Sequence, residues 1–193
     1  MGSHINHRQV GIIGSRQLPT SQCRRIRNCV QYLLDKKYRV SSGGALGADQ
    51  YCIEALLHYG ESSKCTVYSA WRYYSGFPST IRAMMKQFKA QGGHIQWGPC
   101  SAGDYAAVIR MVLLDRNKKL VDASSGIVAF IDETSRGSIF TIKYALKKRK
   151  KVVVFPYNCS PPTLPGIQWK PITCTGPWQG SYVAKHIRGK RHV

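Results

Sequence analysis

The sequence predicts an α/β fold with a mostly parallel sheet, helices on both faces and an irregular basic C-terminal extension. Short apolar runs typical of buried strands alternate with longer segments in which apolar residues recur every three or four positions. Several of these runs lead into glycine-containing turns, which are common where a strand passes into a helix. A chain of 193 residues, 43% of them hydrophobic, is long enough to bury one proper core.

The first third of the chain supplies three strand candidates and two helix candidates. Residues 10–14 are apolar and end in glycine, and residues 38–41 and 65–68 are further short strand candidates. Apolar residues at helical spacing predict helices over 22–36 and 48–59, with Ser21 as the N-cap of the first. The order strand, helix, strand, helix, strand predicts neighbouring parallel strands.

The same alternation continues as far as residue 157. The pattern predicts helices and strands as follows: a helix over 80–91, a short edge strand over 94–97, a long helix over 105–121, a strand over 127–131, its exit loop over 132–138, a helix over 139–148 and a buried strand over 151–155. In the long helix, we expect an inward apolar face of Val108, Val112 and Leu113 and an outward basic face of Arg110, Arg116, Lys118 and Lys119.

Three segments differ in composition. Residues 1–8 open with Met-Gly-Ser-His and are interpreted as a tag remnant or N-terminal arm, and residues 9–157 as the α/β domain. Residues 158–193 are rich in proline and glycine and are predicted to form the basic extension. Its last part, 185–192, is typical of a basic tail that becomes ordered on binding.

The charge balance indicates a polyanionic partner. Lys and Arg number 29 against 9 acidic residues, which gives a net charge of +20, and residues 134–193 contain no Asp or Glu. Such an excess destabilises a compact chain by self-repulsion, so we expect it to serve binding. Nucleic acid is the first expectation and an anionic membrane surface the second. No apolar run has the length of a membrane span, and no signal-peptide pattern opens the chain.

The seven cysteines are scattered and include no C-x-x-C pair. This spacing argues against a zinc ribbon and against a disulfide framework. The six histidines show no convincing ligand spacing either. We therefore expect free thiols in a reducing cytoplasm, no metal and no cofactor.

Three loops that follow predicted strands carry small residues, and two of them also carry an arginine. In parallel sheets the carboxyl ends of the strands meet at one edge, where backbone N–H groups and arginines can hold phosphate. With the basic end of the long helix, these loops give the predicted phosphate-binding residues: Gly14, Ser15, Arg16, Gly43, Gly44, Ala45, Arg116, Asn117, Lys118, Arg136, Gly137 and Ser138. The alternative is that the glycines serve tight packing only and that Asp49 caps its helix.

Two other features allow both a functional and a structural interpretation. The aromatic residues of the loop at 70–78 could stack on unpaired bases or could pack beneath the loop: Trp71, Tyr73, Tyr74 and Phe77. The five consecutive cations at 147–151 could contact phosphates or could form a solvated helix end.

Four motifs resemble the DprA/Smf proteins in order and spacing. They are Gly-Ile-Ile-Gly-Ser-Arg (11–16), Ser-Gly-Gly-Ala-Leu-Gly-Ala-Asp (42–49), Arg-Asn-Lys-Lys-Leu (116–120) and Ser-Arg-Gly-Ser-Ile-Phe-Thr-Ile-Lys-Tyr-Ala (135–145). The resemblance covers about 9–157 and implies a Rossmann-like domain whose basic pocket takes single-stranded DNA. It also implies loading of a RecA-type recombinase and a homodimer. The resemblance does not extend to the flanking helical and winged-helix domains common in that family.

The related LOG proteins suggest an enzyme instead, a nucleotide or nucleoside-monophosphate hydrolase. Their motif P-G-G-x-G-T-x-x-E contains a catalytic glutamate, and the corresponding stretch at 135–143 has none. An acid–base mechanism would need another carboxylate, for which Asp49, Asp132 and Glu133 are the candidates.

The sequence therefore predicts non-catalytic binding of single-stranded nucleic acid, with DNA preferred to RNA, in DNA processing or recombination. A nucleotide-binding sensor or scaffold, and a LOG-like hydrolase, are the alternatives.

Overall fold

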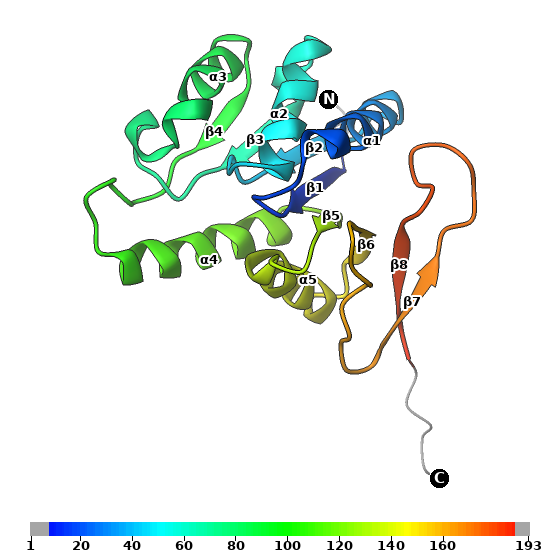
Figure 1. Cartoon of the computed structure of the whole chain (residues 1–193). Helices are drawn as coiled ribbons and strands as arrows, with labels where there is room; N and C mark the ends of the chain where they lie inside the picture. The colour runs from blue at the N-terminus through cyan, green and yellow to red at the C-terminus, as the bar shows by residue number, and fades with distance from the viewer. Residues whose placement is uncertain (1–7, 188–193) are drawn as a thin grey trace, which may run out of the picture.

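One eight-stranded sheet organises residues 8–187, the part of the chain that this computed structural model describes (Figure 1). The strand order is β4-β3-β2-β1-β5-β6-β8-β7. The strands are β1 (Gln9–Gly14), β2 (Arg39–Ser42), β3 (Cys65–Tyr68), β4 (His94–Gln96), β5 (Gly126–Ile131), β6 (Lys151–Pro156), β7 (Ile167–Pro171) and β8 (Tyr182–His186). Strands β1 to β6 pair in parallel, which confirms the predicted α/β class.

The strand order reverses at β1. From β1 the chain builds β2, β3 and β4 on one side, and it then returns to place β5 and β6 on the other. Val10 pairs with Val40 of β2 on one side and with Gly126 of β5 on the other. The carboxyl ends of β1 and β5 therefore flank the switch point, where doubly wound sheets bind their ligands.

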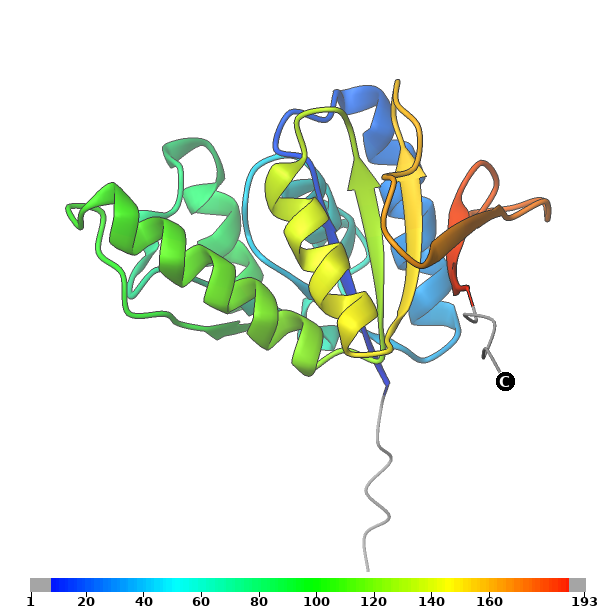
Figure 2. The ribbon, with the colours of Figure 1, turned by 90° about the horizontal axis from the view of Figure 1, so that it is seen from below.

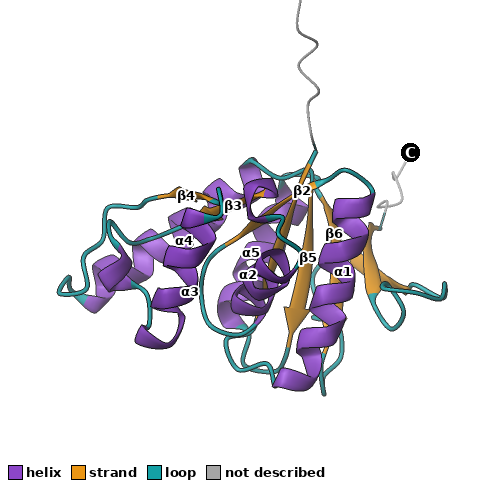
Figure 3. Ribbon diagram, turned by 90° about the horizontal axis from the view of Figure 1, so that it is seen from above, coloured by secondary structure: helices purple, strands orange, loops and turns teal. Residues whose placement is uncertain are grey.

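Helices cover both faces of the sheet (Figure 3). One layer contains α1 (Cys23–Asp35), α2 (Ala48–His58) and α3 (Ser79–Ala90), and the other contains α4 (Ala106–Asp122) and α5 (Arg136–Lys147). Short 3₁₀ turns lie at Thr20–Gln22, Ser62–Lys64 and Tyr74–Gly76. Side chains alternate across a strand, so Ile12 of β1 enters the core beneath α1 and α2 while Ile13 enters the core beneath α4 and α5.

Two predicted helix starts are wrong. Ser21 lies inside the 3₁₀ turn Thr20–Gln22, and α1 begins without a side-chain cap. Helix α5 begins at Arg136 rather than at 139, so the predicted exit loop is shorter. Its turn closes early because the Asp132 N–H donates to Ser135 Oγ at 2.9 Å and the Ser135 hydroxyl donates to Asp132 Oδ1 at 2.8 Å.

Helix α4 departs from the expected pattern of inward and outward faces. Val108 was predicted inward but is 41% exposed, and Arg116 was predicted outward but is buried. The first half of α4 extends past the edge of the helix layer, so its apolar residues lack a covering element (Figure 2). Tyr105 and Met111 are exposed there too.

The extension is less irregular than predicted. β7 and β8 form an antiparallel hairpin, and β8 pairs antiparallel with β6, so the hairpin continues the sheet. The proline-rich composition is compatible with this because Pro171 ends the outermost strand, where a missing N–H is tolerated. Lys185 and His186 belong to β8 and Ile187 follows it, whereas the last five residues of the predicted basic tail, 188–192, lie outside the described residues.

Two further sequence predictions can be compared with residues 8–187. All seven cysteines are free thiols, as expected. No helix in this range is long and apolar enough to cross a membrane.

Candidate functional site

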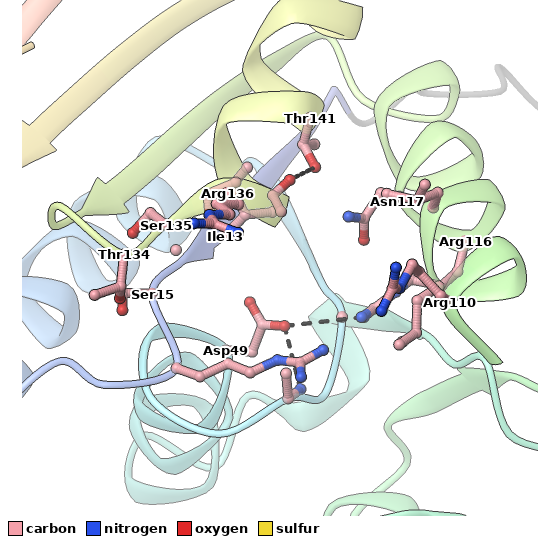
Figure 4. A pocket seen from close by; sticks show the side chains of 18 of the residues that line it. Ile13, Ser15, Asp49, Arg110, Arg116, Asn117, Thr134, Ser135, Arg136 and Thr141 are labelled. Atoms are coloured by element: carbon pink, nitrogen blue, oxygen red, sulfur yellow. Dashed lines mark hydrogen bonds and ion pairs between the residues drawn. The ribbon is translucent and has the colours of Figure 1, made fainter. Parts of the chain in front are cut away.

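A cavity of about 540 Å³ opens at the switch point. Its walls come from the loops after β1, β2 and β5, from the start of α5 and from α4. The predicted residues that line it are Gly14, Ser15, Arg16, Gly43, Ala45, Arg116, Asn117, Arg136, Gly137 and Ser138. Figure 4 shows Ser135 and Arg136 on one side of this cavity and Arg110 and Asn117 of α4 on the other.

Two predicted residues lie outside the cavity. Gly44 has φ of +70°, and a Cβ there would lie 3.0 Å from Phe77 and from Val67, so its open side faces the core. Lys118 forms an ion pair of 2.9 Å with Asp115 on the exposed side of α4. Neither residue is therefore placed to contact a ligand in this cavity.

Ser15 joins three of the loops. Its N–H donates to the Phe130 carbonyl at 2.8 Å, and its carbonyl accepts the Ala48 N–H at 3.1 Å. Its hydroxyl donates to Asp132 Oδ2 at 2.6 Å. A side chain at Gly47 would overlap the Ser15 carbonyl, so this glycine is required for the close approach. The packing interpretation of the glycines is thus correct for Gly47.

A buried ion pair closes the floor of the cavity. Arg116 Nη1 lies 3.9 Å from Asp49 Oδ2 and donates to the Tyr68 carbonyl at 3.2 Å. A Cβ at Gly43 would overlap the guanidinium, so the glycine lets Arg116 cross the loop. Burial raises the pKa of Asp49, and Arg116 opposes that rise. Arg116 is consequently engaged with the protein itself, which explains why the outward prediction failed.

The two helix N-termini at the cavity differ in what they can accept. At α2, the Asp49 carboxylate accepts the Ala45 N–H at 3.2 Å and occupies the positive end of the helix. At α5, the N–H groups of Gly137 and Ser138 have no backbone hydrogen-bond partner within 8–187. The first turn of α5 holds no acidic residue. An anion is therefore favoured at the N-terminus of α5 rather than at that of α2.

Exposed cations surround this helix end, and one wall is apolar. Arg16, Arg110 and Arg136 line the cavity with exposed side chains, and Asp49 is the acidic residue among the lining residues described. The partly buried side chains of α4 that form the apolar wall are Ile109, Leu113 and Leu114. The sequence prediction missed Arg110 as a site residue. Arg110 follows Ile109 directly and precedes Leu113 by three positions, so helical geometry places it at the edge of this apolar wall.

The other two candidate carboxylates, Asp132 and Glu133, lie outside the cavity. Burial opposes ionisation of Asp132, but hydrogen bonds from Ser15, Ser135 and Thr134 hold its pKa below the usual value. Neither Asp132 nor Glu133 forms an ion pair with Arg136 within residues 8–187.

The aromatic loop lies away from the cavity, since none of its residues is in the lining. Phe77 is buried, and Tyr74 packs edge-on against Trp97 with ring centroids 4.9 Å apart. A Cβ at Gly76 would overlap the ring of Trp71. These contacts favour the packing interpretation, although Tyr73 remains 65% exposed.

A doubly wound sheet with a basic cavity at its switch point defines a Rossmann-type protein suited to phosphate-bearing ligands. Residues 2–170 match the family model of DNA recombination-mediator protein A, and the chain belongs to that family. This confirms the resemblance to DprA proteins. No curated protein sequence matches the chain.

Two solved structures have similar folds, each with a TM-score of 0.60. One is DNA processing protein A (DprA) from Streptococcus pneumoniae, which is 20% identical over 80% of this chain and 51% of its own. The other is DNA processing protein A from Helicobacter pylori, described by its single-stranded DNA binding mode, which is 21% identical over 78% of this chain and 66% of its own. This chain thus spans one half to two thirds of these relatives, and the similarity concerns the fold.

Proposed function

We propose that this chain binds single-stranded DNA at the switch-point cavity, without catalysis, in DNA processing or recombination. The observation that carries the proposal is the open N-terminus of α5, where the N–H groups of Gly137 and Ser138 lie among exposed arginines. Phosphate is the anion that such a helix end and arginines bind best together. Membership of the family, and the description of the Helicobacter pylori relative, support DNA as the polymer.

The size and lining of the cavity favour an unpaired strand. A volume of about 540 Å³ suits a ligand of small-molecule size. A base that is paired in a duplex cannot enter such a space unless it leaves the stack, which costs a few kcal/mol. The apolar wall formed by Ile109, Leu113 and Leu114 gives an unpaired base a surface to pack against.

Binding without chemistry fits the state of the carboxylates. Asp49 is buried beside Arg116, and Asp132 accepts hydrogen bonds from hydroxyl groups and lies outside the lining. We further propose that the chain delivers the strand to a RecA-type recombinase, assembles as a homodimer and acts in the cytoplasm. The description of its family as a recombination mediator is in keeping with the first of these.

The test is fluorescence anisotropy with a labelled oligo-dT at several salt concentrations. Arg16→Ala and Arg136→Ala are each expected to weaken binding and to reduce the slope of log affinity against log salt by about 0.7, the value for one phosphate contact on a single strand. Lys86→Ala is the matched control because Lys86 is exposed on α3, in the opposite helix layer. Parent-like binding by both arginine variants would contradict the proposal.

A nucleotide-binding sensor or a LOG-like hydrolase is the second candidate. The observation that favours it is the small volume of the cavity, which also suits one free nucleotide. Mass spectrometry of a denatured extract would detect a nucleotide retained by the purified protein. This candidate would be favoured if nucleotide is retained and if Arg16→Ala and Arg136→Ala bind oligo-dT as tightly as the parent.

A further inference from the structure

A second, strongly polar cavity of about 290 Å³ lies between the start of α1 and the loop that joins β7 to β8. Its lining residues are Ser21, Arg24, Arg25, Asn28, Gly176, Pro177 and Gln179. None of these is acidic, and the first turn of α1 holds no acidic residue either. The cavity therefore combines two guanidinium groups, side-chain amides and the positive end of a helix.

Packing fixes the hairpin loop onto α1. Trp178 packs edge-on against Tyr32 of α1 with ring centroids 5.4 Å apart, and it stacks near Phe155 of β6 at 6.2 Å. The Cys29 thiol donates to the Pro177 carbonyl at 3.3 Å. Figure 2 and Figure 3 both show the hairpin beside α1. The cavity is thus built by two elements held together, and not by a single helix end.

The two arginines are available for a ligand. The Arg25 guanidinium lies over the Phe155 ring, 5.7 Å from its centroid, which holds the group in place while leaving its N–H edge free. Arg24 is exposed. Neither arginine takes part in an ion pair or a side-chain hydrogen bond within residues 8–187. Two nearby cations without a counterion repel each other, and a bound anion relieves that repulsion.

The second cavity adjoins the first through the loop between β1 and α1. Arg16 and Gln17 of this loop line the first cavity, and Ser21 lines the second. Three residues lie between Gln17 and Ser21, so the chain advances four residue steps and their Cα atoms are at most about 14 Å apart. Both cavities lie at the carboxyl ends of the strands, because α1 starts where β1 ends.

We propose that the second cavity is a phosphate subsite for single-stranded DNA that leaves the first cavity and passes over the β1–α1 loop. The inference rests on the proposed function, which it extends from one site to a path along the strand. It assigns Arg24 and Arg25 to phosphates of nucleotides outside the switch-point cavity. Short strands occupy the first cavity alone, whereas longer strands reach both.

The test compares two lengths of oligo-dT, about 2 and about 20 nucleotides. Nucleotides are about 3.4 Å apart along a stacked strand, so the dinucleotide is too short to reach from one cavity to the other, whereas the longer strand can occupy both. Arg24→Gln with Arg25→Gln is expected to leave the shorter strand unaffected. For the longer strand, we expect about 3- to 10-fold weaker binding and a salt slope smaller by about 1.4, twice the value for one contact. Arg24→Gln alone leaves the Arg25 contact with Phe155 in place and should give about half of that change in slope.

The charge-matched control is Lys86→Gln with Lys89→Gln, which removes two exposed cations from α3. An equal loss of long-strand binding in this control would overturn the inference, because the effect would then be generic charge. Parent-like binding by the α1 variants would overturn it too. If Arg16→Ala and Arg136→Ala still weaken binding in that case, the proposed function stands without the second subsite. Absence of binding to both strands by the parent would overturn both proposals.

Discussion

Replacing Arg116 with alanine separates a structural role from a ligand-binding role at the cavity floor. The substitution leaves the buried Asp49 carboxylate without its counterion and removes the donor to the Tyr68 carbonyl. Breaking a buried pair in this way costs about 3–5 kcal/mol. The pair is long, at 3.9 Å, and Asp49 Oδ1 and Arg116 Nε have no hydrogen-bond partner among the described residues. Because the pair is not optimal, we expect a loss of stability at the low end of this range, about 3 kcal/mol.

Urea unfolding followed by tryptophan fluorescence measures this loss. With a slope of about 2 kcal/mol per molar urea, a loss of about 3 kcal/mol lowers the midpoint by about 1.5 M. Burial already raises the pKa of Asp49, and loss of Arg116 raises it further. A raised folded-state pKa gives stability that is present below the unfolded pKa, about 3.9, and lost as pH rises through the folded value. The stability that Arg116→Ala loses relative to the parent should therefore be largest at neutral pH, where Asp49 is charged, and smaller in acid, where Asp49 is protonated.

The double variant Arg116→Ala with Asp49→Asn provides the control. It removes the buried charge as well as its partner, so its midpoint should recover most of the loss at neutral pH. An Arg116→Ala protein with an unchanged midpoint and greatly weakened oligo-dT binding would refute this reasoning, because Arg116 would then serve the ligand and not the fold.

Three further predictions concern individual side chains. A Cβ at Gly43 would overlap the Arg116 guanidinium, whereas a Cβ at Gly137 would meet open space, so thermal unfolding should show Gly43→Ala strongly destabilised and Gly137→Ala within about 1 kcal/mol of the parent. Gly137→Ala should nevertheless bind oligo-dT more weakly than the parent. Equal stability of the two variants would contradict the geometry. The lowered pKa of Asp132 gives stability that is present above about pH 4 and lost in acid, so the advantage of the parent over Asp132→Asn in urea should narrow between pH 6 and pH 3. A thiol reagent at pH 8 should modify the exposed Cys174 in the native protein and spare Cys29, whose pKa burial raises to about 12; rapid loss of both thiols would show that α1 opens readily.

Much of the fold is predictable because its signals are local. Strands buried on both faces are short apolar runs, such as 127–131, and the sequence alone separates them from amphipathic helices. The hairpin of β7 and β8 was missed because its pairing depends on distant contacts. Trp178 meets Tyr32 and Phe155 across the fold, and nothing local in a proline-rich segment reveals this.

The sequence predicted which loops form the candidate site, but not which of its side chains face the ligand and which stabilise the fold. Loops at the carboxyl ends of parallel strands must converge, so Ser15, Gly43 and Gly137 could be placed together from their positions alone. Which arginine faces the ligand could not be predicted. Arg116 and Arg110 lie on the same helix, and the fold buries one against Asp49 and exposes the other. Burial of a charge depends on a partner far away in the chain.

The hydrogen bonds that join Ser15 to Phe130, Ala48 and Asp132 have a consequence for the kinetics of binding. Because one residue already ties the loops after β1 and β5 to the start of α2, these segments are ordered before any strand arrives. Little conformational entropy remains to be lost on association. Encounter with a positively charged, preformed surface should then be fast and depend steeply on salt, and affinity should be set mainly by how quickly the strand leaves.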